Sequence, residues 1–112
     1  MSPSVLPRAE WSAFFANLSR LLQGKQAEIE VLSLALGDAV EAEWLPLLGI
    51  TYAPRNDLIE VALEGVDHMI RKPQEVYVDM GPAGLIRIEV VSADATREII
   101  SLRDPLMLTG PH

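Results

Sequence analysis

The 112-residue sequence contains no cysteine. Without thiols the chain can form no disulfide, and it offers neither a thiolate metal ligand nor a cysteine nucleophile. Basic residues are also scarce, with 9 lysines and arginines against 16 aspartates and glutamates, for a formal net charge of −7. Nucleic acids and anionic membrane surfaces both require a basic patch, and the closest approach to one is Arg71-Lys72. The sequence therefore predicts no nucleic acid and no membrane among the partners.

Long apolar runs are missing as well. No run approaches the roughly 18 residues that cross a bilayer. The first ten residues, MSPSVLPRAE, lack the basic-then-apolar order of a signal peptide. Together with the absence of cysteine, this favours a cytoplasmic location.

Histidine occurs twice, at His68 and His112. A zinc site needs three or four cysteine, histidine or carboxylate ligands, so no metal site and no cofactor is predicted, although a calcium site made of carboxylates alone stays open. EF-hand spacing, a phosphate-binding glycine loop with its lysine, and a GxSxG motif are all missing. The serines also lack motif context, and Ser12 and Ser19 are interpreted as solvated positions of a helix.

The composition is that of a folded globular protein, with 49% hydrophobic and 22% charged residues, and the length suits one domain. We predict a single domain over residues 1–112. Within it we expect a flexible lead-in over 1–7, a helix over 8–23, antiparallel strands over 26–103 and a tail over 104–112.

The helix is predicted from apolar residues at the i, i+3, i+4, i+7 spacing of one helical face. Pro7 suits the first turn, and Gly24 is a natural stop. The apolar residues are Trp11, Phe14, Phe15, Leu18, Leu21 and Leu22.

After Gly24 the apolar pattern alternates with period two in a series of short stretches, which predicts strands. Residues 37–43, GDAVEAE, are interpreted as a polar connection, and SADA as the turn of the last hairpin at Asp94-Ala95. Strands without intervening helices form antiparallel meanders. The predicted fold class is α+β, with the amphipathic helix packed on a bent, mostly antiparallel sheet of five or six strands, as a small, partly open barrel.

Three stretches together resemble a family of short bacterial proteins known only as a domain of unknown function. They are the W-x-x-F-F helix in EWSAFF, the LPLxGI strand in LPLLGITYAPRNDLIEV, and HMIRKPQEVYV followed by LIRIEVVSADATREIISL. The resemblance extends from about Arg8 to Pro105 and rests on apolar and turn residues, so it implies a fold but no catalytic residue, cofactor or substrate. The predicted architecture is also similar, at the level of fold alone, to the Sm-like small barrels. Many of those bind RNA, which the acidic charge argues against here.

His68 lies inside the stretch GVDHMIRK, directly after Asp67. If this stretch is a strand, His68 shares a face with Val66 and Ile70, while Asp67 points to the opposite face. An acid–base pair would therefore need a carboxylate from another strand. No catalytic residue is predicted, and His68 remains a candidate only because histidine titrates near neutral pH. The carboxylates considered as its partner are Glu64, Glu75, Asp79 and Glu89.

A dense apolar stretch, WLPLLGITY, carries bulky residues on both faces of a predicted strand. It is interpreted as core, or as core on one face and a contact with another chain on the other face. Open sheet edges offer a second route to self-association. The candidate ligand-binding or interface residues are Trp11, Phe15, Trp44, Leu48 and Tyr52.

Three functions follow in order of preference. The first is a non-enzymatic cytoplasmic domain that acts by protein association, most simply as a homodimer. The second is a module that binds a small ligand or peptide in a groove between helix and sheet, lined by Trp11, Phe15, Trp44 and Tyr52. The third is a hydrolase-like enzyme that uses His68.

Overall fold

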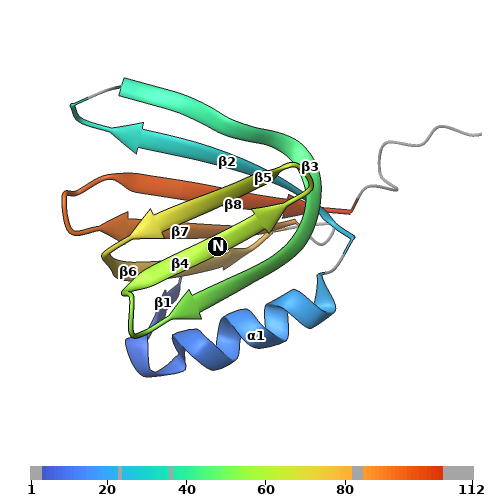
Figure 1. Cartoon of the computed structure of the whole chain (residues 1–112), viewed down its shortest axis with the longest axis horizontal. Coiled ribbons are helices and arrows are strands. Elements are labelled where there is room, and N and C mark those ends of the chain that lie inside the picture. The colour runs from blue at the N-terminus through green and yellow to red at the C-terminus, as the bar shows by residue number, and fades with distance from the viewer. Residues whose placement is uncertain (1–3, 23, 36, 82–84, 105–112) are drawn as a thin grey trace, which may run out of the picture.

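The computed structural model describes residues 4–22, 24–35, 37–81 and 85–104. These residues form one antiparallel sheet of eight strands in the order β1-β6-β7-β8-β2-β3-β4-β5, with one α-helix against it (Figure 1). The strands are β1 (Ser4–Leu6), β2 (Gln26–Ser33), β3 (Gly37–Ala53), β4 (Leu58–Leu63), β5 (Val66–Arg71), β6 (Pro73–Met80), β7 (Ile86–Ser92) and β8 (Arg97–Arg103). The helical elements are the 3-10 turn η1 (Arg8–Glu10) and the helix α1 (Trp11–Leu21).

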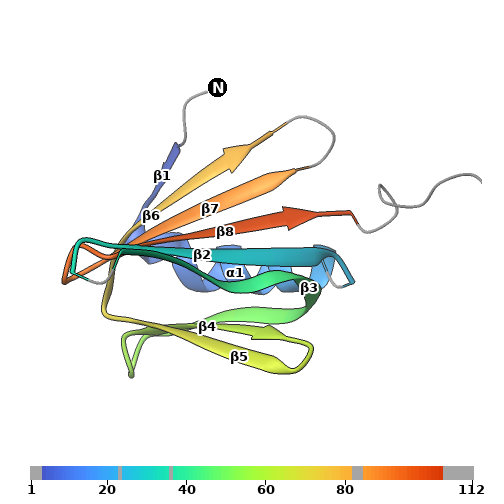
Figure 2. The same ribbon diagram turned by 90° about the horizontal axis from the view of Figure 1, so that it is seen from above.

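Strand β3 has 17 residues and folds the sheet over on itself. Its first half (residues 37–43) pairs with β2, and this pairing continues to Pro46, whereas its second half (residues 47–53) pairs with β4. Trp44, between the two halves, has a positive φ of 52°, which turns the chain shortly before the pairing partner changes at Leu47. As a result β4 and β5 form one layer opposite a second layer that contains β2, β8, β7 and β6 (Figure 2). Helix α1 runs along one side of the molecule and contacts β3 (Figure 1).

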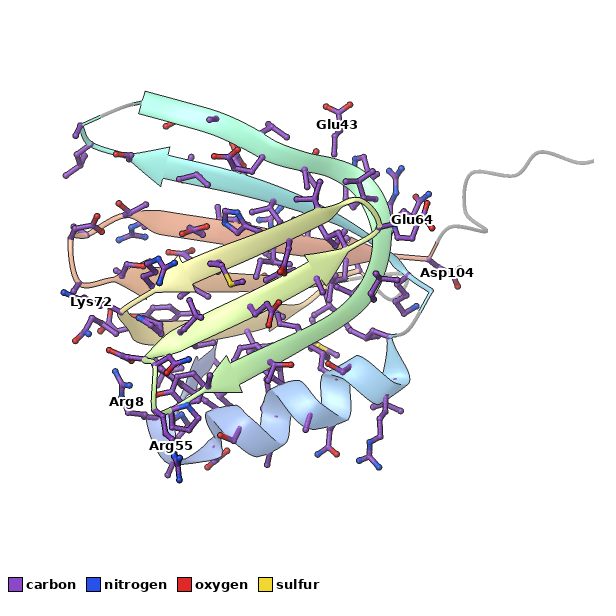
Figure 3. All side chains as sticks on the ribbon, in the orientation of Figure 1. Arg8, Glu43, Arg55, Glu64, Lys72 and Asp104 are labelled. Carbon is purple, nitrogen blue, oxygen red and sulfur yellow. The ribbon has the colours of Figure 1, made fainter. Side chains whose placement is uncertain are left out.

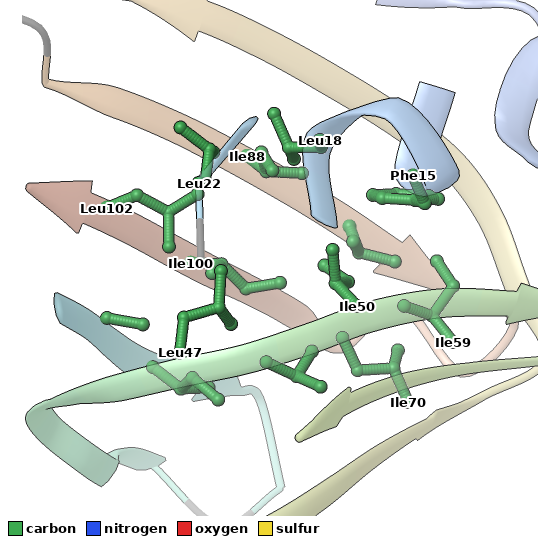
Figure 4. Close-up of a cluster of buried hydrophobic side chains, with 14 of the residues drawn as sticks. Phe15, Leu18, Leu22, Leu47, Ile50, Ile59, Ile70, Ile88, Ile100 and Leu102 are labelled. Atoms are coloured by element: carbon green, nitrogen blue, oxygen red, sulfur yellow. The ribbon is translucent and has the colours of Figure 1, made fainter. Parts of the chain in front are cut away.

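The core lies between the two layers and α1, where apolar side chains from the helix and from seven strands point toward one another (Figure 4). Alternation along each strand turns every second residue inward, which produces one continuous apolar interior. All of its members are at most 8% exposed. The bulkiest of them are Trp11, Phe15, Ile29, Leu47, Ile50, Ile59, Ile70, Ile88, Ile100 and Leu102.

The predicted helix is confirmed in position, and its predicted apolar face is buried or half-buried except at Leu21, which is 77% exposed. Residues 8–10 form a 3-10 turn rather than the first α-helical turn, and α1 ends at Leu21. Gly24 follows with a φ of +90°, a left-handed conformation that favours glycine and ends the helix as predicted.

Ser19 corrects one interpretation of the helix surface. Its hydroxyl donates a hydrogen bond to the Ile50 carbonyl oxygen (2.7 Å) and accepts one from the Ile50 N–H (2.9 Å). The hydroxyl thus satisfies both backbone groups of one residue beside the bulge at Leu47 and Gly49 in the β3–β4 pairing. Ser19 therefore fastens α1 to the second half of β3 and is not a solvated position.

The predicted fold class is wrong in its number of strands and in its proportion of helix to strand. Eight strands dominate the described chain, where five or six were expected beside a helix. Two segments contribute to the difference, one by adding a strand and the other by lengthening β3. Residues 4–6 lie in the predicted flexible lead-in but pair as β1 with β6, and residues 37–43, predicted as a polar connection, extend β3. The sheet is also open, with β1 and β5 at its two ends, so the predicted small barrel is not closed by strand pairing.

The last hairpin is confirmed between β7 and β8. The Ser92 N–H donates to the Thr96 carbonyl, and the Ala95 N–H donates to that of Ser92. Ala95 has a φ of +70°, so it occupies the position where glycine is more usual.

Some predictions fall on residues outside the described ranges. They concern the tail from residue 105 onward, which includes His112. Within the described chain no helix combines the length and the apolarity needed to cross a bilayer.

Candidate functional site

His68 lies on β5 with its side chain turned toward the interior. It pairs with Val61 of β4 and shares the inner face with Val66 and the fully buried Ile70, while Asp67 is exposed on the outer face. This arrangement agrees with the alternation expected from the sequence. Asp67 and His68 are therefore not a pair.

The carboxylate that meets His68 belongs to Glu98 of β8. His68 Nε2 donates a hydrogen bond to Glu98 Oε1, and the two side chains are only 17% and 10% exposed. The contact crosses from one layer of the folded sheet to the other, because β5 and β8 are separated by three strands in the sheet order. A cross-layer ion pair of this kind ties β5 to the opposite layer.

None of the four carboxylates considered from the sequence is this partner. Glu98 was missed because the fold-over of β3, which places β5 on β8, is not visible in local alternation. A signal was nevertheless present in REIISLR, where Glu98 alternates with Ile100 and Leu102 and so falls on an apolar face. An acid on one inward face and a histidine on another would have suggested a pair, since buried charges are normally partnered.

The surroundings of His68 favour its protonated form. The hydrogen bond to Glu98 raises the pKa of His68 above its ordinary value of 6.5, and the negative charges of Glu98 and Glu41 act in the same direction. Burial opposes them, because a charged imidazole loses hydration, but the raising effects prevail. Glu41 belongs to the first half of β3, so this electrostatic contact also relates β5 to that segment.

Chemically, a histidine oriented by a carboxylate resembles the base of a catalytic dyad. Catalysis also requires a space in which a reacting group can approach the imidazole. Two surface cavities, of about 340 and 370 Å³, are both lined by residues other than His68 and Glu98. In the described chain no three histidine, aspartate or glutamate side chains gather as metal ligands do. What the geometry does show is an ion pair that joins the two layers.

The aromatic residues proposed to line a groove occupy two different settings. Trp11 and Phe15 are 1% and 0% exposed, so they fill the space between α1 and the sheet. Tyr52 meets the Trp11 ring edge to face, with centroids 5.1 Å apart, and its hydroxyl accepts a hydrogen bond from Arg8. The Trp11 indole N–H donates to the Leu6 carbonyl of β1. These contacts make this group part of the interior packing.

Trp44 and Leu48 lie elsewhere on β3. Trp44, at the bend, is half-buried beneath the Arg103 guanidinium, which lies 3.8 Å from the ring centroid. Leu48 points outward and is exposed. The five proposed residues therefore do not converge on one surface.

A different surface stands out on the side of the molecule opposite α1, which we call the open side. It is bordered by β5 and by the first half of β3 (Figure 1). Both segments are edges, since no described strand pairs with the outer edge of β5 or with the edge of residues 37–43 that faces away from β2. Residues 37–41 are all exposed, including Val40 at 53%.

Charges are distributed unevenly along these edges. Lys72 follows β5 at one end of the molecule, together with Arg8 and Arg55, whereas Glu43 and Glu64 lie toward the other end (Figure 3). Asp38 begins the first half of β3 at the basic end, because the cavities lined by Asp38 and by Lys72 both border the β7–β8 turn. Among charged side chains, the edge of residues 37–43 therefore carries only acidic ones, whereas β5 carries both Asp67 and Arg71.

A model for a family of unknown function, DUF5335, matches residues 2–111. The chain belongs to this family. The match covers the stretches from which a family of unknown function was recognised in the sequence, so that resemblance is confirmed. The likeness to Sm-like barrels is not confirmed, since no solved structure matches the chain.

One relative is a protein of Aquifex aeolicus (strain VF5) described as "Uncharacterized protein". It is 36% identical over 109 residues, which cover 96% of this chain and 98% of the relative. The similarity therefore extends over the whole fold rather than over a single motif. Neither the family description nor the relative's name assigns a substrate or a partner.

Proposed function

We propose that this protein is a non-enzymatic cytoplasmic domain that acts by association, and that its simplest assembly is a homodimer formed through the open side. The observation that carries the proposal is the pair of free strand edges there. Along β5 and along residues 37–43 of β3, the backbone N–H and C=O groups of alternate residues face no strand of the described chain. Such edges pair readily with another chain unless they are short or blocked.

The other end of the sheet, at β1, is less suited to pairing with another chain, which supports the choice of the open side. β1 has only three residues, and a strand that short is a common protection against edge pairing. β5 is twice as long, and neither proline nor a bulge interrupts it. Val40 and the 95% exposed Leu34 add apolar surface to the β2–β3 hairpin. Association through the open side would cover this surface.

The other two functions have less support. A groove between α1 and the sheet would have to open among Trp11 and Phe15, which are core side chains. An enzyme that uses His68 would need a substrate cavity beside the imidazole, and the two described cavities lie at other residues. Association requires no rearrangement of the folded chain.

Sedimentation velocity over a wide concentration range tests the proposal. We expect a reversible equilibrium between monomer and dimer, with a dissociation constant on the order of micromolar because the edges are small. A single sedimenting species with the mass of one chain at every concentration would contradict association as the function.

A further inference from the structure

We propose that the dimer is reciprocal: the edge of β5 pairs antiparallel with the first half of the partner's β3, and the first half of β3 pairs with the partner's β5. In this arrangement Arg71 lies opposite the partner's Asp38, and Met69 lies opposite the partner's Val40. The inference rests on the proposed function, because it specifies the surface and the register of the association.

The direction of the strands is the first argument. β3 reverses direction at its bend, so its first half runs toward the Glu43 end of the molecule, whereas β5 runs from Glu64 toward Lys72 (Figures 1 and 3). The two edges are therefore antiparallel within one chain. A two-fold axis parallel to the strands preserves strand direction, so each edge also meets the partner's opposite edge in antiparallel orientation.

Backbone hydrogen bonding gives the second argument. β4 and β5 are joined by a two-residue turn, so the closing residues Leu63 and Val66 bond to each other. Bonding then alternates along β5, and the N–H and C=O groups of Asp67, Met69 and Arg71 face the free edge. In the β2–β3 hairpin the closing pair is Ser33 and Gly37. By the same alternation, Asp38 and Val40 face their free edge.

The proposed register therefore brings outward-facing backbone groups together. Residues whose N–H and C=O groups both face the gap form the hydrogen-bonded pairs of an antiparallel ladder. Met69 opposite the partner's Val40 is such a pair, and Arg71 opposite the partner's Asp38 is the next one. A shift by one residue would set outward-facing groups against groups already bonded to β2.

Side-chain chemistry gives the third argument. Asp38 and Arg71 are both exposed, and neither forms an ion pair with any residue that the structure describes. Their side chains lie on the outer face, since Asp38 pairs with the outward Leu32 and Arg71 follows the inward Ile70. The register thus joins opposite charges in a chain whose net charge of −7 disfavours unspecific self-association.

The same register extends the pairing to the inner face. It places Ile70 opposite the partner's Ala39 and His68 opposite the partner's Glu41. The negative charge of Glu41 in the same chain already raises the pKa of His68. In the dimer each imidazole would therefore lie between acidic side chains of both copies. On the outer face the half-buried Met69 would cover the exposed Val40 of the partner subunit. In these pairs apolar side chains therefore face apolar side chains, and basic side chains face acidic ones.

Disulfide trapping tests the register directly, because the chain has no cysteine of its own. Met69→Cys and Val40→Cys are made as separate variants, then mixed and oxidised. We expect a covalent dimer from the mixture and at most a trace from either variant alone, since cross-strand partners meet disulfide geometry. Thr51→Cys, at an exposed position in the second half of β3, replaces Met69→Cys as the matched control and should give no covalent dimer.

Charge exchange provides an independent measurement. Asp38→Arg and Arg71→Asp should each weaken dimerisation about tenfold, because each variant sets like charges opposite one another at two symmetric places. Their combination in one chain restores opposite charges and should return the dissociation constant to within about threefold of the original.

The outcomes separate this inference from the function on which it rests. A wild-type chain that stays monomeric contradicts both. A wild-type dimer whose Met69→Cys and Val40→Cys mixture crosslinks no better than the Thr51→Cys control contradicts the register and leaves association standing. Efficient crosslinking of Met69→Cys alone would show β5 pairing with itself and would also overturn the reciprocal arrangement.

Discussion

The two halves of β3 share one strand and differ in almost everything around it. The second half pairs with β4, buries Leu47 and Ile50, and is fastened to α1 by Ser19. The first half pairs with β2 alone, and residues 37–41 are exposed. The second half thus finds its packing and hydrogen-bond partners within the chain, whereas the first half has a free strand edge and an exposed surface.

This difference is the reason for placing the proposed association at the first half of β3, and it does not depend on any catalytic motif. A strand segment is closed to other chains when side chains cover it and when both of its edges have partners, as β4 on one edge and Ser19 of α1 at Ile50 on the other provide for the second half. The first half of β3 meets neither condition in the single chain. Substitutions should therefore affect folding in the second half and dimerisation in the first.

The largest expected effect is in the second half. Ile50→Ala removes a fully buried side chain and should lower the free energy of unfolding by about 2–5 kcal/mol. Val40→Ala, in the first half, should change it by no more than about 0.5 kcal/mol at concentrations where the chain is monomeric. Urea denaturation of dilute protein measures both. Equal losses from the two variants would show that the halves do not differ in the monomer.

A smaller effect is expected at the ion pair that joins β5 to the opposite layer of the sheet. Glu98→Gln replaces the charged partner of His68 and should lower the free energy of unfolding by about 1–3 kcal/mol near pH 6. The pKa of His68 is raised in the folded state, so its stabilising contribution is complete below the ordinary value of 6.5. That contribution is lost as the pH rises through the raised value.

The pH dependence separates the ion pair from simple packing. The native chain should lose stability between slightly acidic and alkaline pH, and Glu98→Gln should reduce that loss. Urea titrations at several pH values measure it. A native chain whose stability rises over this range would mean that His68 is not held in its protonated form.

The smallest expected effect concerns the link between α1 and the second half of β3. Ser19→Ala removes two hydrogen bonds to Ile50 and should cost about 1 kcal/mol. Ser12→Ala, at an exposed position of the same helix, is the matched control and should be nearly neutral. If both variants unfold at the same urea concentration, Ser19 does not stabilise the contact between α1 and β3.

Much of the fold was predictable from local pattern. The helix and the alternating strands follow from spacing that is visible in a window of about ten residues. The missed strands depend on distant partners. β1 has three residues that gain their conformation from β6, and residues 37–43 are exposed, so no apolar alternation marks them.

The candidate site was less predictable for the same reason. Alternation placed His68 on the inner face, but its partner Glu98 is brought near by the bend of β3. Ser19 looked like a solvated helix residue because its hydrogen-bond partner, Ile50, lies in another element. The free edges were anticipated as a general property of open sheets, while their position on the open side required the strand order.

Hydrogen–deuterium exchange at two protein concentrations tests the central claim most directly. Raising the concentration should slow exchange in peptides that cover residues 37–43 and β5, because their outward N–H groups gain partners. Peptides from the second half of β3 should be protected equally at both concentrations, and β1 should not change. Concentration-independent exchange in both edges, or new protection confined to β1, would contradict association through the open side.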